Sequence, residues 1–170
     1  MIVANGVERT EMWAEGLVKN FARPPAGGDT DLLKATAAGQ CNIALANTYY
    51  LGRMKNSESD QIRKAAENLE VFWPNQGEND RGAHVNVSGA GITKYAKNVE
   101  SGIALLEYLV KDESQKWYAE VNNEYPVVNG VMMSDTLRGF GKFKADTLNL
   151  SKLGEMNAEA VKLMDRAGWK

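Results

Sequence analysis

Apolar residues recur at helical spacing over much of the chain and alternate with polar residues in short stretches between. Helical spacing and capping residues predict helices over residues 7–21, 31–38, 51–56, 61–68, 98–110, 114–121, 131–138 and 158–167. In the first of these helices, Met12, Trp13 and Leu17 share one face, which predicts that Trp13 packs into a core. Gly39 is placed to end the second helix, and Asn157 to begin the last.

Shorter apolar stretches between the helices predict buried β-strands. Alternation around Ile43 and Leu45 predicts a strand over residues 42–46. Clustered or alternating apolar residues predict two more strands, over residues 69–73 and 83–87. Strands that alternate with helices in this way are typical of an α/β fold.

Two adjacent tyrosines follow the first predicted strand. Asn47 and Thr48, which can stop a strand and cap a helix, come directly before Tyr49 and Tyr50. Ligands bind at the carboxyl ends of strands in open α/β sheets, so the two phenols could form one site. A phenolate is a hard anionic oxygen donor that suits ferric iron, and the metal must displace the phenol proton because free tyrosine titrates near pH ~10. Aromatic pairs also pack in cores or at surfaces, so the pair alone leaves both interpretations open.

Composition restricts the function classes. The chain has 170 residues, enough for one domain with a hydrophobic core, and its 44% hydrophobic and 25% charged residues are typical of a globular protein. Its 20 Lys and Arg residues are offset by 22 Asp and Glu residues, and a net charge of -2 argues against a nucleic-acid-binding surface. No apolar run approaches the ~20 residues of a membrane span. The first residues lack the basic-then-apolar pattern of a signal peptide.

The single cysteine and the single histidine give little support for enzyme chemistry. Cys41 allows no internal disulfide and is expected to be a buried structural residue. His84 is expected to be a hydrogen-bonded structural residue. A serine hydrolase would need His84, a serine such as Ser88 and a carboxylate, but no nucleophile elbow is present, and a Cys41–His84 dyad is equally unsupported. We therefore expect no enzyme, since no general acid–base pair is evident.

Several stretches carry a family resemblance, in the same order along the chain. They read Pro-Pro-Ala-Gly-Gly-Asp-Thr-Asp at 24–31, Ala-Ala-Gly-Gln-Cys at 37–41, Ala-Leu-Ala-Asn-Thr-Tyr-Tyr at 44–50, His-Val-Asn-Val-Ser-Gly-Ala-Gly-Ile-Thr at 84–93 and Asn-Glu-Tyr-Pro-Val at 123–127. With these stretches, the chain resembles the ferric-iron substrate-binding proteins of bacterial ABC transporters. The resemblance implies the type II periplasmic-binding-protein fold, in which helices flank a mixed sheet and two hinged lobes close on Fe(III).

The resemblance also implies a ligand set. By position it makes Tyr49 and Tyr50 iron ligands and Asn47 an accessory residue that helps to hold a synergistic anion. Family members complete the sphere with another tyrosine, and often with a histidine, an arginine or a carboxylate, which are expected upstream of this chain. Two phenolates alone predict weak iron binding by the chain itself. The alternative is a binding protein of the same fold for an oxyanion or a small organic solute, with Tyr49 and Tyr50 as its walls and no metal.

The same resemblance predicts how the chain is divided. Residues 1–80 are expected in the second lobe, residues 81–129 in the first, and residues 130–170 in the second again. Family members are roughly twice this length, as two ordinary domains would be, so the chain is expected to be a carboxy-terminal portion. A periplasmic location and a membrane permease as partner are implied. Residues 81–129 would lack sheet partners, which predicts dimerisation, strand exchange or partial disorder there.

Overall fold

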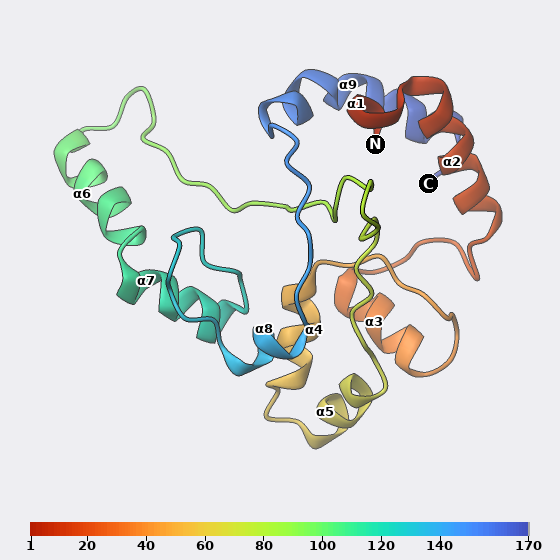
Figure 1. The fold of residues 1–170 in the computed structure, drawn as a ribbon, viewed down its shortest axis with the longest axis horizontal. Coiled ribbons are helices and arrows are strands. Elements are labelled where there is room, and N and C mark those ends of the chain that lie inside the picture. The colour runs from red at the N-terminus through yellow and green to blue at the C-terminus, as the bar shows by residue number, and fades with distance from the viewer. Residues whose placement is uncertain (170) are drawn as a thin grey trace. The chain divides into compact units, whose positions relative to one another are not determined.

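The chain forms two compact units in the computed structural model, which describes residues 1–169 (Figure 1). The first unit joins Met1–Gly27 to the segment that begins at Asp146, and the second is Gly28–Ala145. The lobes expected at residues 1–80, 81–129 and 130–170 stay a prediction.

The first unit is built from both ends of the chain. It contains α1 (Ile2–Asn5), α2 (Val7–Lys19) and α9 (Ser151–Arg166). Its core joins Ala14 of α2 to Leu163 and Ala167, and the Arg166 guanidinium donates two hydrogen bonds of 2.7 Å to the Glu11 carboxylate. The unit therefore depends on segments that lie at opposite ends of the sequence.

Two details of the first unit differ from the sequence-based expectations. Trp13 is 43% exposed, because α2 buries its small residues Thr10 and Ala14 instead. The final helix begins at Ser151 rather than near Asn157, because Asn149 accepts a hydrogen bond of 3.0 Å from the Ser151 N–H and so starts the helix earlier.

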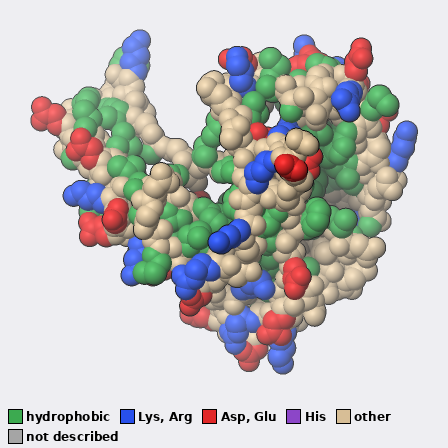
Figure 2. Space-filling model, viewed as in Figure 1, with side chains coloured by type: hydrophobic (Ala, Val, Ile, Leu, Met, Phe, Trp, Pro, Cys, Tyr) green, Lys and Arg blue, Asp and Glu red, His purple; other side chains and the backbone are tan. Residues whose placement is uncertain are grey.

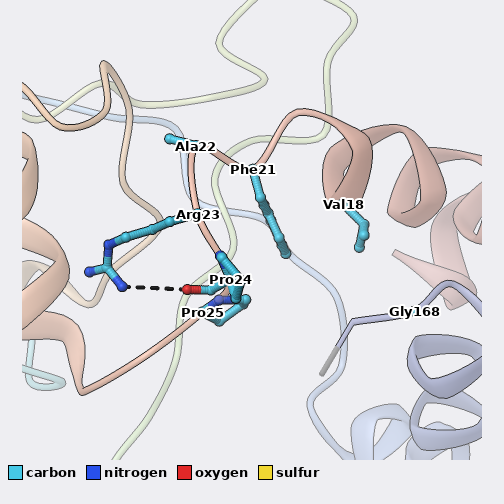
Figure 3. A pocket seen from close by; sticks show the side chains of 7 residues that line it. All are labelled: Val18, Phe21, Ala22, Arg23, Pro24, Pro25 and Gly168. Carbon is cyan, nitrogen blue, oxygen red and sulfur yellow. Dashed lines mark hydrogen bonds between the residues drawn. The ribbon is translucent and has the colours of Figure 1, made fainter.

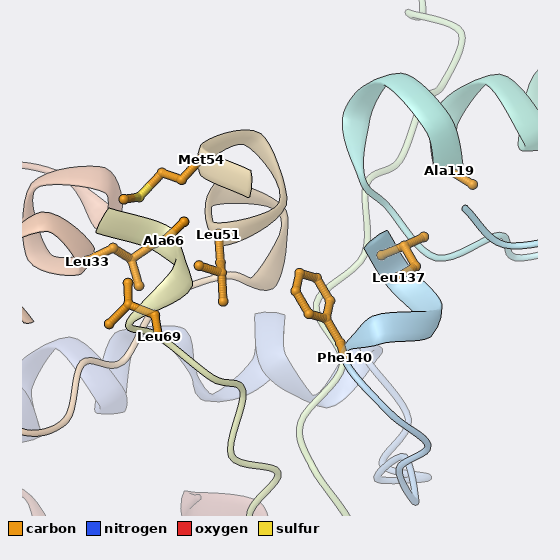
Figure 4. Close-up of a cluster of buried hydrophobic side chains, with 8 residues drawn as sticks. All are labelled: Leu33, Leu51, Met54, Ala66, Leu69, Ala119, Leu137 and Phe140. Atoms are coloured by element: carbon orange, nitrogen blue, oxygen red, sulfur yellow. The ribbon is translucent and has the colours of Figure 1, made fainter. Parts of the chain in front are cut away.

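Helices of the second unit follow the predicted ones within a few residues. They are α3 (Asp29–Ala37), α4 (Thr48–Lys55), α5 (Asp60–Glu67), α6 (Val99–Leu109), α7 (Asp112–Trp117), a π-helix η1 (Tyr118–Asn122) and α8 (Asp135–Gly139). Figure 4 shows the core that these helices and their connections share, made by Leu33, Leu51, Met54, Ala66, Leu69, Ala119, Leu137 and Phe140. This core holds α4, the helix that carries both tyrosines.

The predicted strands are not found among the described residues, where the one β-interaction is an isolated parallel bridge between Ala83 and Ala145. The period-two alternation is nevertheless present over residues 42–46. Ala44 packs against the core, whereas Ile43 is 81% exposed and Leu45 points outward with it. Residues 42–46 therefore do not form the predicted buried strand here, since a strand needs a hydrogen-bonded neighbour and none is described beside them. The mixed sheet stays a prediction.

Helix α6 exposes much of its apolar surface. None of its residues is buried, although Ile103, Leu106 and Leu109 form the apolar stripe expected from the sequence. Figure 2 shows hydrophobic side chains on the surface over α6, at the left of the view. Dimerisation, strand exchange or partial disorder of residues 81–129 stays a prediction. Among the described residues, no helix has the length and hydropathy needed to cross a membrane.

Tyr125 provides a test of the core. Its ring meets Trp73 and Phe143 edge-on, at centroid distances of 6.5 Å and 5.5 Å, and those two rings stack on each other. Its hydroxyl is buried with no hydrogen-bond partner among the described residues, and burial raises the pKa of Tyr125 to about 12. An unpartnered buried hydroxyl costs about 1–3 kcal/mol, so we expect Tyr125→Phe to raise the free energy of unfolding by about 1 kcal/mol at neutral pH.

The pH dependence of this effect has a definite sign. The unfolded tyrosine ionises near pH ~10 and the folded one only near pH 12, so wild-type stability is lost as the pH rises through that window. The stability advantage of Tyr125→Phe should therefore widen above pH ~10, as measured by urea unfolding. Tyr95→Phe, at an exposed position, is the control and should give no such widening.

Candidate metal centre

The start of α4 is fixed by a contact with α3. The Asp29 carboxylate, in the first turn of α3, accepts hydrogen bonds from the backbone N–H and the side-chain amide of Asn47, at 2.8 Å and 3.3 Å. Asn47 occupies the N-cap position of α4, but its side chain makes no capping bond. The expected capping role of the Asn47 side chain is therefore wrong, because Asp29 engages its amide. This contact sets the direction in which the first turn of α4 leaves the extended segment before it.

Tyr49 and Tyr50 lie together in that first turn. Adjacent residues on a helix do not normally face one another. Here, however, the two rings meet, with centroids 4.4 Å apart and planes inclined by 41°. Both side chains are half-buried, so one part of each ring is packed and another part is accessible. The structure thus brings the two predicted ligands into one site.

Neighbouring groups shift the pKa of Tyr49 in opposite directions. The pKa of Tyr49 is raised, first because its phenol hydrogen-bonds to Tyr50, then by partial burial and by the negative charges of Tyr50 and Asp29. The Arg53 guanidinium works in the opposite direction and lies 5.7 Å from the centroid of each ring. A trivalent cation would reverse this balance, because a bound metal ion is the largest local charge and favours the phenolate.

Other residue types do not offer a competing metal site. Among the described residues, no three His, Cys, Asp or Glu side chains gather closely enough to hold a metal ion. Cys41 is half-buried rather than buried, with its sulfur 3.2 Å from the Thr36 hydroxyl. His84 is exposed, and Ser88 donates its hydroxyl hydrogen to Glu124 at 3.0 Å. The phenols therefore remain the candidate donors.

A hollow in the first unit has the wrong chemistry for a cation. Figure 3 shows its lining side chains, which enclose about 450 Å³ and are Val18, Phe21, Ala22, Arg23, Pro24, Pro25 and Gly168. The one charged group is the Arg23 guanidinium, which donates a hydrogen bond to the Pro24 carbonyl. No lining side chain carries an oxygen donor, so this hollow supplies no side-chain ligand for a hard cation.

Two residues near the tyrosines were missed by sequence reasoning. Asp29 lies inside α3, where its negative charge raises the pKa of Tyr49 and its carboxylate accepts a hydrogen bond from Asn47. Arg53 was not considered, although its spacing from the two tyrosines places it near them on a helix. A residue three or four positions beyond each tyrosine lies over the same helix face.

The sequence was compared with families of known proteins and with curated relatives. The family model of bacterial extracellular solute-binding proteins matches residues 4–145. Iron uptake protein A1 of Synechocystis sp. is 47% identical over 170 residues, which is 100% of this chain and 47% of that protein. The chain thus spans about half the length of the curated relatives it matches.

Solved structures resemble the chain closely. A Trichodesmium protein, IdiA (FutA), in complex with iron and citrate is 52% identical with a TM-score of 0.94, and the match covers 99% of this chain and 53% of that one. The ferric binding protein from Campylobacter jejuni is 37% identical with a TM-score of 0.94, over 99% of this chain and 53% of that one. These matches confirm the expected type II periplasmic-binding-protein architecture, apart from the mixed sheet.

Proposed function

Because the chain belongs to the family of bacterial extracellular solute-binding proteins, we propose that it forms part of a receptor that binds Fe(III) for an ABC transporter. The observation that carries the proposal is the contact between Tyr49 and Tyr50, half-buried in the first turn of α4. Adjacent phenols at one accessible point supply two hard oxygen donors to a single ion. The names of the relatives, an iron uptake protein and ferric binding proteins, support this choice of cargo.

The proposed binding step is an exchange of protons for a metal. Fe(III) would take one phenolate from each tyrosine, and both phenol protons would leave to solvent. Two phenolates offset two of the three positive charges. A synergistic anion would supply further charge and donors, and the citrate in the Trichodesmium complex supports an anion of this kind.

Asn47 is the proposed accessory to that anion. Its side-chain amide carries two hydrogens, and Asp29 accepts one of them. We propose that the second hydrogen is donated to the anion, so that Asp29 orients the amide and Asn47 presents it.

The remaining parts of the receptor follow from the family. We propose a periplasmic, two-lobed protein without enzymatic activity, which closes around the ion and is recognised by a membrane permease. Residues 1–80 and 130–170 are assigned to the second lobe and residues 81–129 to the first, and the other iron ligands are assigned to the half of the receptor that this chain does not span. The alternative cargo, an oxyanion or a small organic solute without metal, has less support because the named relatives bind or take up iron.

Spectroscopy of the chain with ferric citrate tests the proposal. Coordination of Fe(III) by phenolate should give a visible charge-transfer band that grows as iron is added. We expect Tyr49→Phe combined with Tyr50→Phe to abolish the band. The matched control Tyr95→Phe, at an exposed position in the same unit, should retain it.

The titration separates the two candidate cargoes. Affinity should be weak, because two phenolates leave most coordination positions to water and anion. If wild type gives no band at millimolar iron, or if the double phenylalanine variant keeps it, the ferric proposal fails. The metal-free alternative would be favoured if calorimetry detects binding of citrate without iron and if adding iron then gives no charge-transfer band.

A further inference from the structure

Helix α4 has a contact on its backbone that only glycine permits. A Cβ atom added to Gly52 would lie 2.6 Å from both Cβ and Cγ of Asn123 and 2.9 Å from its Oδ1. Carbon atoms pack favourably at about 3.5–4.0 Å, so any side chain at position 52 would force the two segments apart. Asn123 therefore lies directly on the helix that carries the tyrosines.

Asn123 is held in this place by its own backbone and by hydrogen bonds. It follows η1, is 2% exposed and has left-handed backbone angles of φ 58° and ψ 37°, which asparagine tolerates better than most residues. Its Oδ1 accepts a hydrogen bond of 2.9 Å from the Asn56 amide, and the Asn56 Oδ1 accepts one of 3.0 Å from the Thr136 hydroxyl. The contact thus links α4 to η1 and α8.

The position of this contact on α4 determines what it can control. Tyr49, Gly52 and Asn56 are separated by three and four residues, so they lie along one face of the helix. A side chain that packs on Gly52 and bonds at Asn56 fixes the rotation of α4 about its axis. Because the tyrosines occupy the first turn of the same helix, that rotation sets the direction in which their phenols point.

We infer that Asn123 is a positioning residue for the tyrosine pair, acting through its contact with Gly52 and its hydrogen bond to Asn56. The inference rests on the proposed function, since it assigns Asn123 a role in iron binding and not only in packing. It is distinct from a ligand role, because the Asn123 side chain bonds to Asn56.

Three variants test the inference in the ferric citrate titration. Gly52→Ala should lower the ferric affinity by roughly tenfold to a hundredfold, the range seen when groups that orient metal ligands are removed, and should shift the maximum of the charge-transfer band. Asn123→Gly, which tolerates the left-handed backbone, should give a smaller loss. Gly52→Ala added to Asn123→Gly should change affinity little further, because the atoms with which the new methyl group clashes are gone.

The matched control is Gly16→Ala, within helix α2, where no described atom other than those of the neighbouring residues and the backbone of α2 lies within 4 Å of the added carbon. It should bind iron as wild type does. The inference is overturned if folded Gly52→Ala keeps wild-type affinity and band position, or if the double variant is no better than Gly52→Ala. If Gly52→Ala does not fold by circular dichroism, wild-type affinity in Asn123→Gly overturns it instead. If the wild-type chain gives no band, the proposed function fails. If the wild-type chain gives a band and the variants match it, only this inference fails.

Discussion

The ferric affinity of the chain is expected to rise about a hundredfold for each unit of pH in the range below the pKa values of the two phenols. Each tyrosine must lose one proton to become a ligand, and each proton contributes a factor of ten per pH unit. The pKa of Tyr49 is raised by its hydrogen bond to Tyr50, by partial burial and by the Asp29 charge. The site without iron therefore keeps its proton, and acid favours release of the metal.

Affinity is best measured between about pH 6 and about pH 8, at a free Fe(III) concentration set by a chelator whose own protonation is known. Iron binding should also release about two protons from the chain, detectable by an indicator dye. Tyr49→Phe should bind more weakly and with about half the logarithmic slope, because one phenol is left. A pH-independent affinity, or an unchanged slope in Tyr49→Phe, would contradict coordination by two phenolates.

Truncation of Leu137 is expected to destabilise the second unit strongly. Leu137 is fully buried at 0% exposure, and it packs in the cluster that holds α4. Leu137→Ala removes apolar contacts and leaves a cavity, which costs about 2–5 kcal/mol in the free energy of unfolding. Urea unfolding followed by circular dichroism measures the loss.

Leu105→Ala is the matched control. Leu105 lies in α6 of the same unit and is largely exposed, so its truncation should change stability by less than about 0.5 kcal/mol. Equal losses in the two variants would show that the α8 side of the core does not stabilise the unit.

Local signals explain why most helices could be predicted from the sequence. The Asp31 carboxylate accepts a hydrogen bond of 3.0 Å from the Gly28 N–H at the start of α3, and Gly39 follows the end of the same helix with φ of +77°. Both are interactions over a few residues, which the sequence displays directly. The tyrosine pair was found in the same way, because it follows a strand-like stretch and the strand-stopping Asn47.

Features that depend on distant partners could not be predicted from the sequence. Whether residues 42–46 join a sheet depends on a neighbouring strand, not on their own alternation. Burial of Trp13 depended on which face α9 covers, and the small residues of α2 were covered instead. The bond between Asp29 and Asn47 spans 18 residues, and the approach of Asn123 to Gly52 joins segments still farther apart. The periodicity of hydrophobic residues in the sequence indicates neither contact.

The order of synthesis delays the packing of the first unit. Helix α2 is translated before the second unit, whereas Leu163 and Arg166, which cover it, follow only after that unit. At bacterial elongation rates this delay is on the order of ten seconds. During that time the Ala14 face of α2 lacks the cover that α9 gives it in the folded unit.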